Sequence, residues 1–146
     1  MLMKTINSGI FQQGGFLEVT VFKGKLYARK DVFYSSLENH SCTVQYEGRK
    51  YHMKIESFFE RIGRGNTIQT PIESINPVMI PILSITGDLK FYYKMSDSMY
   101  DVIGEGSIPI TTICQQFRTK KWLPVYNHHS EKTGEILFEA RYLPPQ

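Results

Sequence analysis

This chain lacks several features that would embed it in a membrane or mark it as an enzyme. No apolar run approaches the roughly 20 residues that cross a bilayer, so we expect no transmembrane segment. The N-terminus holds no continuous apolar stretch and no small-residue cleavage site, which argues against a signal peptide. No nucleophile elbow, phosphate-cradling glycine loop or zinc-ligand spacing occurs. We therefore expect neither catalytic activity nor a cofactor.

Cysteine is scarce, since the sequence contains only Cys42 and Cys114, far apart and outside any paired motif. Two free thiols in a reducing cytosol fit this pattern better than a disulfide. The start Met1-Leu2 predicts no myristoylation, and the end Pro144-Pro145-Gln146 offers no cysteine for prenylation. These observations predict a cytoplasmic protein that meets a membrane, if at all, from its surface.

What the chain does contain favours β-structure. Aromatic residues make up 13% of its 146 residues, β-branched residues are plentiful and alanine is rare. The length suits one domain with a substantial core, which we place at residues 15–144 after a lead-in at 1–14. The formal net charge of +3 permits an anionic partner without requiring one, because so small a charge creates no strong overall field.

Short alternating segments recur along the sequence, beginning with Leu17, Val19 and Val21. A period of two indicates half-buried strands. About eight such strands at regular spacing predict an all-β fold, an eight-stranded antiparallel β-sandwich with Greek-key connections. Lys23-Gly24-Lys25 is expected to turn the chain after the first strand.

Two segments depart from this alternation. Residues 111–118 are the best candidate for one short helix. Residues 56–66 show no clear period, and we expect an insertion after the third strand with a short helical turn under Phe58 and Phe59. Pro81 lies inside an apolar run and predicts an edge strand or a bulge, because proline cannot donate a hydrogen bond to a ladder.

Four short motifs follow one another along the chain. The first is Phe16-Leu17-Glu18-Val19-Thr20-Val21, the second Ile75-Asn76-Pro77-Val78, and the third Asp101-Val102-Ile103-Gly104-Glu105. The fourth comprises three closing segments, Trp122-Leu123-Pro124, Gly134-Glu135-Ile136 and Tyr142-Leu143-Pro144. Together they resemble the C2 domain family, β-sandwich modules that often bind membranes through calcium. The resemblance extends over nearly the whole chain and implies the second, circularly permuted strand order.

The resemblance also implies where calcium would bind, and most of those positions have lost their carboxylates. Asp31 matches an aspartate of the family's first loop, and Asn39 lies near the second position. In the third loop Tyr93 and Met95 replace two alternate aspartates, and Asp101 remains. Calcium takes about six to eight oxygen ligands, several of them anionic, which a phenol and a thioether do not supply. We expect no metal; a calcium sensor using the two remaining aspartates is the less favoured alternative.

Basic residues gather around a predicted hairpin. They offer candidate contacts for anionic lipids, because each lysine or arginine near an anionic surface contributes on the order of 1 kcal/mol. The candidates are Arg49, Lys50, Lys54, Arg61 and Arg64. Two further clusters are Lys23, Lys25, Arg29 and Lys30, and Arg118, Lys120 and Lys121. Charges scattered over three places are equally consistent with a role in solubility alone.

Apolar residues in the apical loops offer a second route to a membrane or a partner protein. Phe33 and Tyr34 in the first loop and Met99 and Tyr100 in the third carry side chains that settle at a membrane interface. The alternative for Phe33 is that it packs the loop onto the sandwich. A dry protein-binding surface at this tip is a further alternative.

The leading hypothesis is a calcium-independent C2-like domain that acts as a peripheral targeting or adaptor module on anionic membranes, including those with phosphoinositides. The alternative is a protein-interaction scaffold that binds no lipid. Nucleic-acid binding is not expected, because no recognisable RNA-binding motif accompanies the basic residues. The adjacent His128 and His129 are expected at the surface rather than at a metal site. The sequence does not indicate an oligomeric state.

Overall fold

The computed structural model describes residues 14–27, 40–61, 64–66, 77–94 and 102–145. These residues form ten strands and one short helix. The elements are β1 (Phe16–Tyr27), β2 (Ser41–Tyr46), β3 (Arg49–Lys54), β4 (Glu56–Arg61), β5 (Arg64–Asn66), β6 (Val78–Pro81), β7 (Asp88–Lys94), β8 (Val102–Pro109), α1 (Ile110–Gln116), β9 (Arg118–Tyr126) and β10 (Lys132–Leu143). No helix among the described residues is long and apolar enough to cross a membrane.

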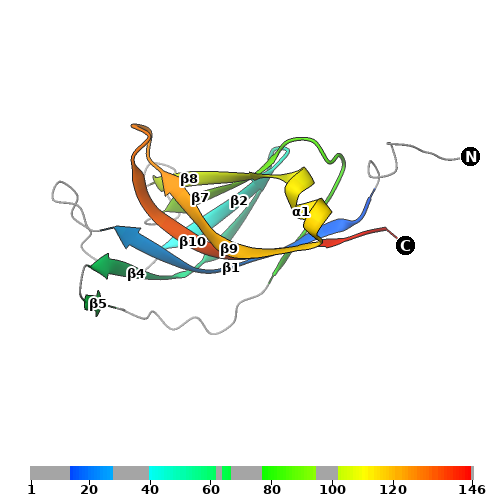
Figure 1. The fold of residues 1–146 in the computed structure, drawn as a ribbon. Helices are drawn as coiled ribbons and strands as arrows, with labels where there is room; N and C mark the ends of the chain where they lie inside the picture. Colours follow the sequence, from blue (N-terminus) through cyan, green and yellow to red (C-terminus); the bar gives the residue numbers. More distant parts are fainter. Residues whose placement is uncertain (1–13, 28–39, 62–63, 67–76, 95–101, 146) are drawn as a thin grey trace, which may run out of the picture.

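The strands follow the order β3-β2-β7-β8-β9-β10-β1-β4-β5, and β6 pairs with β1. The path folds into two layers, and Figure 1 shows β9, β10 and β1 in front of β2, β7 and β8. The layers join where β8 meets β9, at the single pair Glu105 and Tyr126. All strand pairs are antiparallel except β1 with β4. The predicted all-β sandwich with one short helix is confirmed.

The core lies between the two layers and is lined by the inward members of each alternating strand. Leu17, Val19 and Val21 of β1 are at most 2% exposed, as their period-two spacing predicted. Phe91 of β7 and Phe138 of β10 meet across the sandwich with ring centroids 4.8 Å apart. Such a contact between aromatic rings from opposite layers adds specific geometry to the burial of apolar area.

Two local predictions from the sequence are corrected by the structure. Phe58 and Phe59 lie in strand β4, so the predicted helical turn is wrong, although residues 56–66 do form an insertion as a β4–β5 hairpin. The predicted turn at Lys23-Gly24-Lys25 is also wrong, because β1 continues to Tyr27 with a bulge between Val21 and Lys23. A bulge inserts one residue into a strand and bends it without ending it.

Helix α1 spans residues 110–116, close to the predicted 111–118, and buries Ile110, Ile113 and Cys114 against the core. Phe117 ends it with a φ of 61°, and its carbonyl accepts a 2.8 Å hydrogen bond from the Tyr142 amide of β10. The helix is therefore anchored to the last strand immediately after its final turn.

Candidate functional site

Strand β3 presents Lys50, His52 and Lys54 on one side of the sheet. Because side chains alternate along a strand, these three residues share a face, while Tyr51 and Met53 point to the opposite side and pack against the core. Lys50, His52 and Lys54 are all exposed. The outward face of this edge strand therefore carries its positive charge.

The register across β2 brings two more lysines onto the same face. In one row across the three strands, Gln45 of β2 lies between Lys50 of β3 and Lys90 of β7. In a second row, Ser41 of β2 lies between Lys54 of β3 and Lys94 of β7. A middle row joins His52, Thr43 and Tyr92 in the same way. We call this surface the basic face; it comprises Lys50, His52, Lys54, Lys90, Tyr92 and Lys94.

The dimensions of the basic face follow from sheet geometry. Neighbouring strands lie about 4.8 Å apart and residues rise about 3.4 Å along a strand, so the Cα atoms of the four lysines mark a rectangle of roughly 10 by 14 Å. Thr43 Oγ1 lies 2.8 Å from His52 Nδ1 near its centre, and this hydrogen bond holds the imidazole in place. The exposed lysines Lys50, Lys54 and Lys90 have flexible stems that can therefore reach anionic groups above the centre.

Within the described part of the chain, none of the four lysines of the basic face forms an ion pair. The nearest carboxylate in register is Glu105 of β8, opposite Tyr92, and it forms no ion pair with them either. Asp88 also lies on this side, two residues before Lys90 on β7, so four positive charges face two negative ones. Lys94 is only 6% exposed and the other three lysines are exposed. The uncompensated charge is concentrated on one side of the sandwich.

The other basic candidates from the sequence occupy different positions. Arg49 is exposed but lies opposite the buried Tyr46 in register, and so belongs to the other side of β3. Arg61 of β4 and Arg64 of β5 are register neighbours in the β4–β5 hairpin. This hairpin adjoins β1, at the other end of the strand order from β3. The structure therefore joins Lys50 and Lys54 with residues of β7 and places the three arginines elsewhere.

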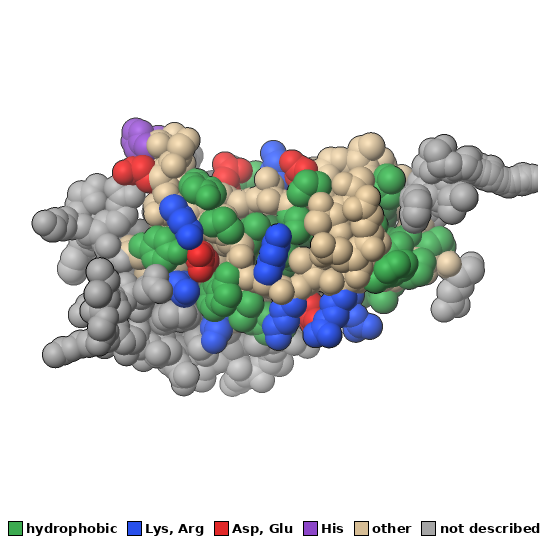
Figure 2. Space-filling view, in the orientation of Figure 1, with side chains coloured by type: hydrophobic (Ala, Val, Ile, Leu, Met, Phe, Trp, Pro, Cys, Tyr) green, Lys and Arg blue, Asp and Glu red, His purple; other side chains and the backbone are tan. Residues whose placement is uncertain are grey.

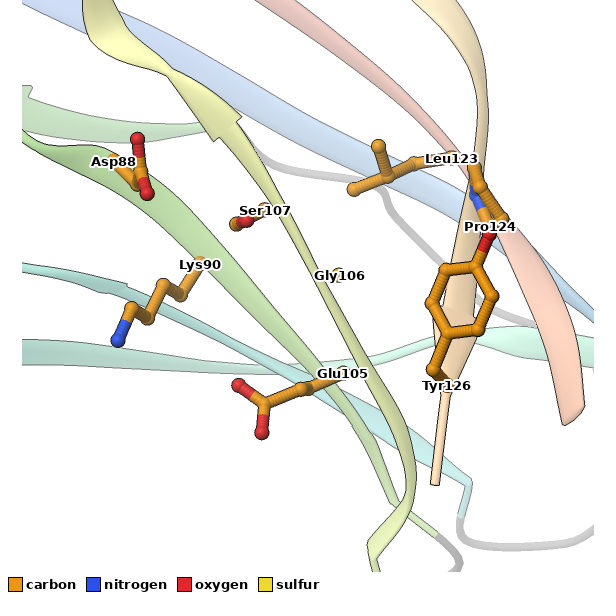
Figure 3. Close-up of a pocket in the computed structure, with 8 residues that line it drawn as sticks. All are labelled: Asp88, Lys90, Glu105, Gly106, Ser107, Leu123, Pro124 and Tyr126. Carbon is orange, nitrogen blue, oxygen red and sulfur yellow. The ribbon is translucent and has the colours of Figure 1, made fainter. Parts of the chain in front are cut away.

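A shallow hollow of about 430 Å³ borders the basic face where β7 and β8 approach β9. It is lined by Asp88, Lys90, Glu105, Gly106, Ser107, Leu123, Pro124 and Tyr126. Figure 3 shows the side chains of Lys90 and Glu105 pointing away from β9, while the Tyr126 ring lies along that strand. Gly106 permits the close approach, because a Cβ atom there would lie 2.6 Å from the Pro124 carbonyl oxygen. Charges of both signs line the hollow, so it extends the basic face without adding to its positive charge.

Tyr93 occupies a position at which the resemblance implies a calcium-binding aspartate, and its side chain is completely buried. Its hydroxyl donates a 2.6 Å hydrogen bond to Ser57 Oγ of β4, and its ring meets His40 edge-on at 5.8 Å. Gly24 makes room for the ring, because a Cβ atom there would lie 2.3 Å from it. Tyr93 therefore belongs to the core of the sandwich, where a phenol supplies packing and no anionic oxygen.

The remaining titratable residues considered in the sequence lie in the core and at the surface. Cys42 is completely buried, and this burial raises the pKa of its thiol to about 12. A hydrogen bond with the Tyr92 backbone and the positive charge of Lys94 lower the pKa, but by less than burial raises it. His128 and His129 are exposed in the loop between β9 and β10. The exposure of His128 and His129 confirms the prediction that they lie at the surface, and Cys42 is a core residue.

The apical-loop candidates lie outside the described residues, and their assignments stay predictions. They are the calcium positions Asp31, Asn39, Met95 and Asp101 and the contact residues Phe33, Tyr34, Met99 and Tyr100. The same holds for Arg29 and Lys30 of the second basic cluster.

Comparison with known proteins identifies the architecture. No protein-family model and no curated protein matches the chain. Among solved structures, a C2 domain-containing protein from a putative elicitor-responsive gene matches with a TM-score of 0.64 at 18% identity over 96% of each chain. A structure of the two C2 domains of extended synaptotagmin 2 matches with a TM-score of 0.59 at 10% identity, covering 90% of this chain and 42% of that one.

A calcium-bound structure of the same two domains of extended synaptotagmin 2 matches with a TM-score of 0.58 at 12% identity, covering 90% of this chain and 46% of that one. At these identities the likeness shows the fold alone. This chain has the fold of C2 domains, as its sequence motifs predicted. The circularly permuted strand order stays a prediction.

Proposed function

We propose that this chain is a non-catalytic C2-like domain that binds anionic membrane surfaces, including phosphoinositide headgroups, through the basic face and without calcium. The observation that carries the proposal is the convergence of Lys50, Lys54, Lys90 and Lys94 from two strands onto one face with no ion pair among the described residues. Each such lysine contributes on the order of 1 kcal/mol when it approaches an anionic surface.

Independence from calcium is supported by the burial of Tyr93. Its side chain fills the sandwich between Ser57 and Gly24, at a position where the family resemblance implies a metal ligand. Without that ligand, attraction between lysine ammonium groups and lipid phosphates supplies the binding energy. Such attraction is screened by salt over a Debye length of about 8 Å at physiological ionic strength. The proposed setting is the cytoplasmic surface of a membrane, where anionic lipids are concentrated.

Vesicle sedimentation tests this function. Vesicles of phosphatidylcholine alone are compared with vesicles that also contain phosphatidylserine or a phosphoinositide, in the presence of a calcium chelator. We expect binding only to the anionic vesicles, unchanged by the chelator and weakened by added salt. Lys50→Glu and Lys90→Glu should each weaken binding about tenfold or more, since each exchanges an attraction for a repulsion.

Lys121→Glu is the matched control, because it makes the same charge change at an exposed position of β9, outside the basic face. It should leave vesicle binding within about twofold of the original protein. The proposal fails if anionic vesicles do not bind, if the chelator abolishes binding, or if all three substitutions weaken it equally. The last result would mean that binding follows total charge and not this face.

A further inference from the structure

Strand β3 lies at one end of the strand order, so only one of its two edges is paired. Its partner is β2, and the register between them has no bulge over the six residues of β3. Within the part of the chain that the structure describes, no strand pairs with the other edge. We call this other edge the open edge of β3.

The hydrogen bonds to β2 show which backbone groups the open edge presents. The Ile55 amide, just beyond β3, donates a 3.1 Å hydrogen bond to the His40 carbonyl, so these two residues form a hydrogen-bonded pair. Such pairs alternate along an antiparallel ladder. The residues of β3 that bond to β2 in this way are therefore Arg49, Tyr51 and Met53. The residues whose N–H and C=O groups point to the open edge are Lys50, His52 and Lys54.

Other strands at the margins of the sheet are less suited to receive a further strand. β5 has three residues, and β6 contains Pro81, which lacks an N–H group. Edges that stay free in native proteins are commonly short, bulged or interrupted by proline. β3 has six residues, no proline and no bulge, and lysines alone protect it. Lysines deter a basic or neutral strand but attract an acidic one.

The two sides of β3 call for different side chains in an added strand. Lys50 and Lys54 are exposed on the outward side, with His52 between them. Tyr51 and Met53 are half-buried on the other side, where they pack against the core. An apolar side chain beside Tyr51 or Met53 would cover their remaining exposed surface. An acidic side chain beside either lysine would form a cross-strand ion pair.

We propose that the open edge of β3 receives an extended acidic segment of a partner protein as an additional antiparallel strand. The backbone of the segment would exchange hydrogen bonds with Lys50, His52 and Lys54. Acidic side chains four residues apart would lie opposite the two lysines, and apolar side chains would lie opposite Tyr51 and Met53. Backbone hydrogen bonds supply affinity in this mode of recognition, and the alternating side chains supply specificity.

Charge favours such a segment over a second copy of the chain. Two β3 strands paired about His52 would place Lys50 of each copy opposite Lys54 of the other, and like charges directly opposite destabilise a pair. The only carboxylate of the β2–β3 hairpin is Glu47, in its turn. Glu56 follows in β4, which pairs with β1. A lipid surface offers phosphates but no row of backbone donors and acceptors at strand spacing.

The layer of β9, β10 and β1 offers no comparable site. Figure 2 shows this layer, with basic and acidic side chains interspersed over it. Glu135 lies 2.9 Å from Lys132, and Glu18 lies 3.0 Å from Arg141. Its central strand, β10, is paired on both edges, with β9 and with β1. These cations already have carboxylate partners, whereas Lys50 and Lys54 form no ion pair within the described residues.

A synthetic peptide with a terminal fluorophore tests the added strand by fluorescence anisotropy. Its central sequence is Glu-Val-Thr-Val-Glu, so its glutamates match the spacing of Lys50 and Lys54. A second peptide, with the centre Val-Glu-Thr-Glu-Val, has the same composition, but its glutamates are two residues apart and can lie opposite only one lysine. We expect the first peptide to bind saturably and about fivefold more tightly than the second.

Methylation of single backbone nitrogens in the peptide distinguishes strand addition from charge attraction alone. With threonine opposite His52, the threonine N–H points to β3 and the valine N–H groups point away from it. N-methylation of the threonine should weaken binding about fivefold or more, because it removes a hydrogen bond and places a methyl group between the strands. N-methylation of one valine keeps the same charge and should change affinity by less than about twofold.

Substitutions in the protein locate the site. His52→Pro removes the middle donor of the open edge without removing a hydrogen bond to β2, and should weaken peptide binding about fivefold or more. His52→Ala loses the same imidazole but keeps the N–H, and should stay within about twofold. Lys54→Glu should weaken binding about tenfold, whereas Lys90→Glu makes the same charge change on β7 and should stay within about twofold. Thermal unfolding of each variant, followed by circular dichroism, separates lost binding from lost folding.

The proposal is overturned if the first peptide does not bind, if the two peptides bind equally, or if methylation of the threonine weakens binding no more than methylation of a valine. It also fails if Lys90→Glu weakens binding as much as Lys54→Glu. A dimer of the chain in sedimentation velocity that His52→Pro abolishes would assign the edge to a second copy and would likewise overturn it. Peptide binding is measured without lipid, and Lys90→Glu should weaken vesicle binding alone, so this inference does not depend on membrane binding.

Discussion

Removing the hydroxyl of Tyr93 should destabilise the fold measurably, because the residue links β7 to the β4 insertion. Tyr93 and Ser57 are both completely buried, and the 2.6 Å hydrogen bond between their hydroxyls has no competition from solvent. Tyr93→Phe leaves the ring and its volume in place and removes the donor, so no cavity of consequence forms. The Ser57 hydroxyl then loses this partner, which costs about 1–2 kcal/mol in the free energy of unfolding.

Urea unfolding followed by Trp122 emission measures this loss, and thermal unfolding provides a second measure. For a chain of this length, about 1 kcal/mol lowers Tm by roughly 2–4 °C, so Tyr93→Phe should lower it by roughly 2–8 °C. Tyr92→Phe is the matched control. Tyr92 is the neighbouring tyrosine, half-buried on the outward side of β7, and it forms no hydrogen bond through its hydroxyl within the described part of the chain. Its substitution should change the free energy of unfolding by less than about 0.5 kcal/mol.

A double-mutant cycle isolates the contact itself. Ser57→Ala removes the Ser57 end of the hydrogen bond with the buried Tyr93 hydroxyl, whereas the double variant Ser57→Ala with Tyr93→Phe removes both polar groups. The double variant should therefore be more stable than the sum of the two single changes predicts, by about 1 kcal/mol. A coupling energy below about 0.3 kcal/mol would refute this account of Tyr93 as a core residue tied to the insertion.

Three further outcomes follow from the packing and the pKa shifts. Gly134→Ala should lower Tm by several degrees, since its Cβ atom would lie 2.3 Å from a β1 carbonyl oxygen, and thermal unfolding checks this. Burial raises the pKa of both Cys42 and Cys114, so iodoacetamide at about pH 8 should label neither until urea unfolds the chain, as followed by mass spectrometry. Burial acts to raise the pKa of Glu135, but hydrogen bonds led by that of Lys132 outweigh it and leave this pKa below its ordinary value. The original protein should therefore have a higher Tm than Glu135→Gln, with the full difference present above about pH 5 and a smaller one as the pH falls below about 4. An equally large difference in Tm at about pH 3 would contradict the lowered pKa.

Lys50 and Lys54 could be recognised from the sequence, because they alternate along a short segment beside an obvious hairpin turn. Lys90 and Lys94 show the same alternation, with Phe91 and Tyr93 on the buried side of β7. Their membership of the same face could not be predicted, since it depends on which strand lies beside β2. Strand neighbours are set by long-range packing, and the alternation of a single strand carries no information about them.

The course of β1 could not be predicted for a different reason. Lys23-Gly24-Lys25 was interpreted as a turn, because glycine between polar residues commonly marks one. In the structure Gly24 is required by the Tyr93 ring that lies against it, and β1 runs on through a bulge that turns Phe22 and Lys23 to the same side. A glycine needed for close packing and a glycine needed for a turn look identical in sequence. Only the tertiary contact distinguishes them.

The two layers of the sandwich therefore differ in a way that total charge conceals. A net charge of +3 is mild for the whole chain, yet the basic face concentrates four lysines from β3 and β7 beside two carboxylates, Asp88 and Glu105. On the opposite layer each glutamate of β1 and β10 is held by a lysine or an arginine. An anionic surface is attracted to the basic face, whereas on the opposite layer the glutamates already neutralise part of the positive charge and repel such a surface. The charge pattern therefore favours the layer that holds β3, β2 and β7 as the one that would meet an anionic membrane.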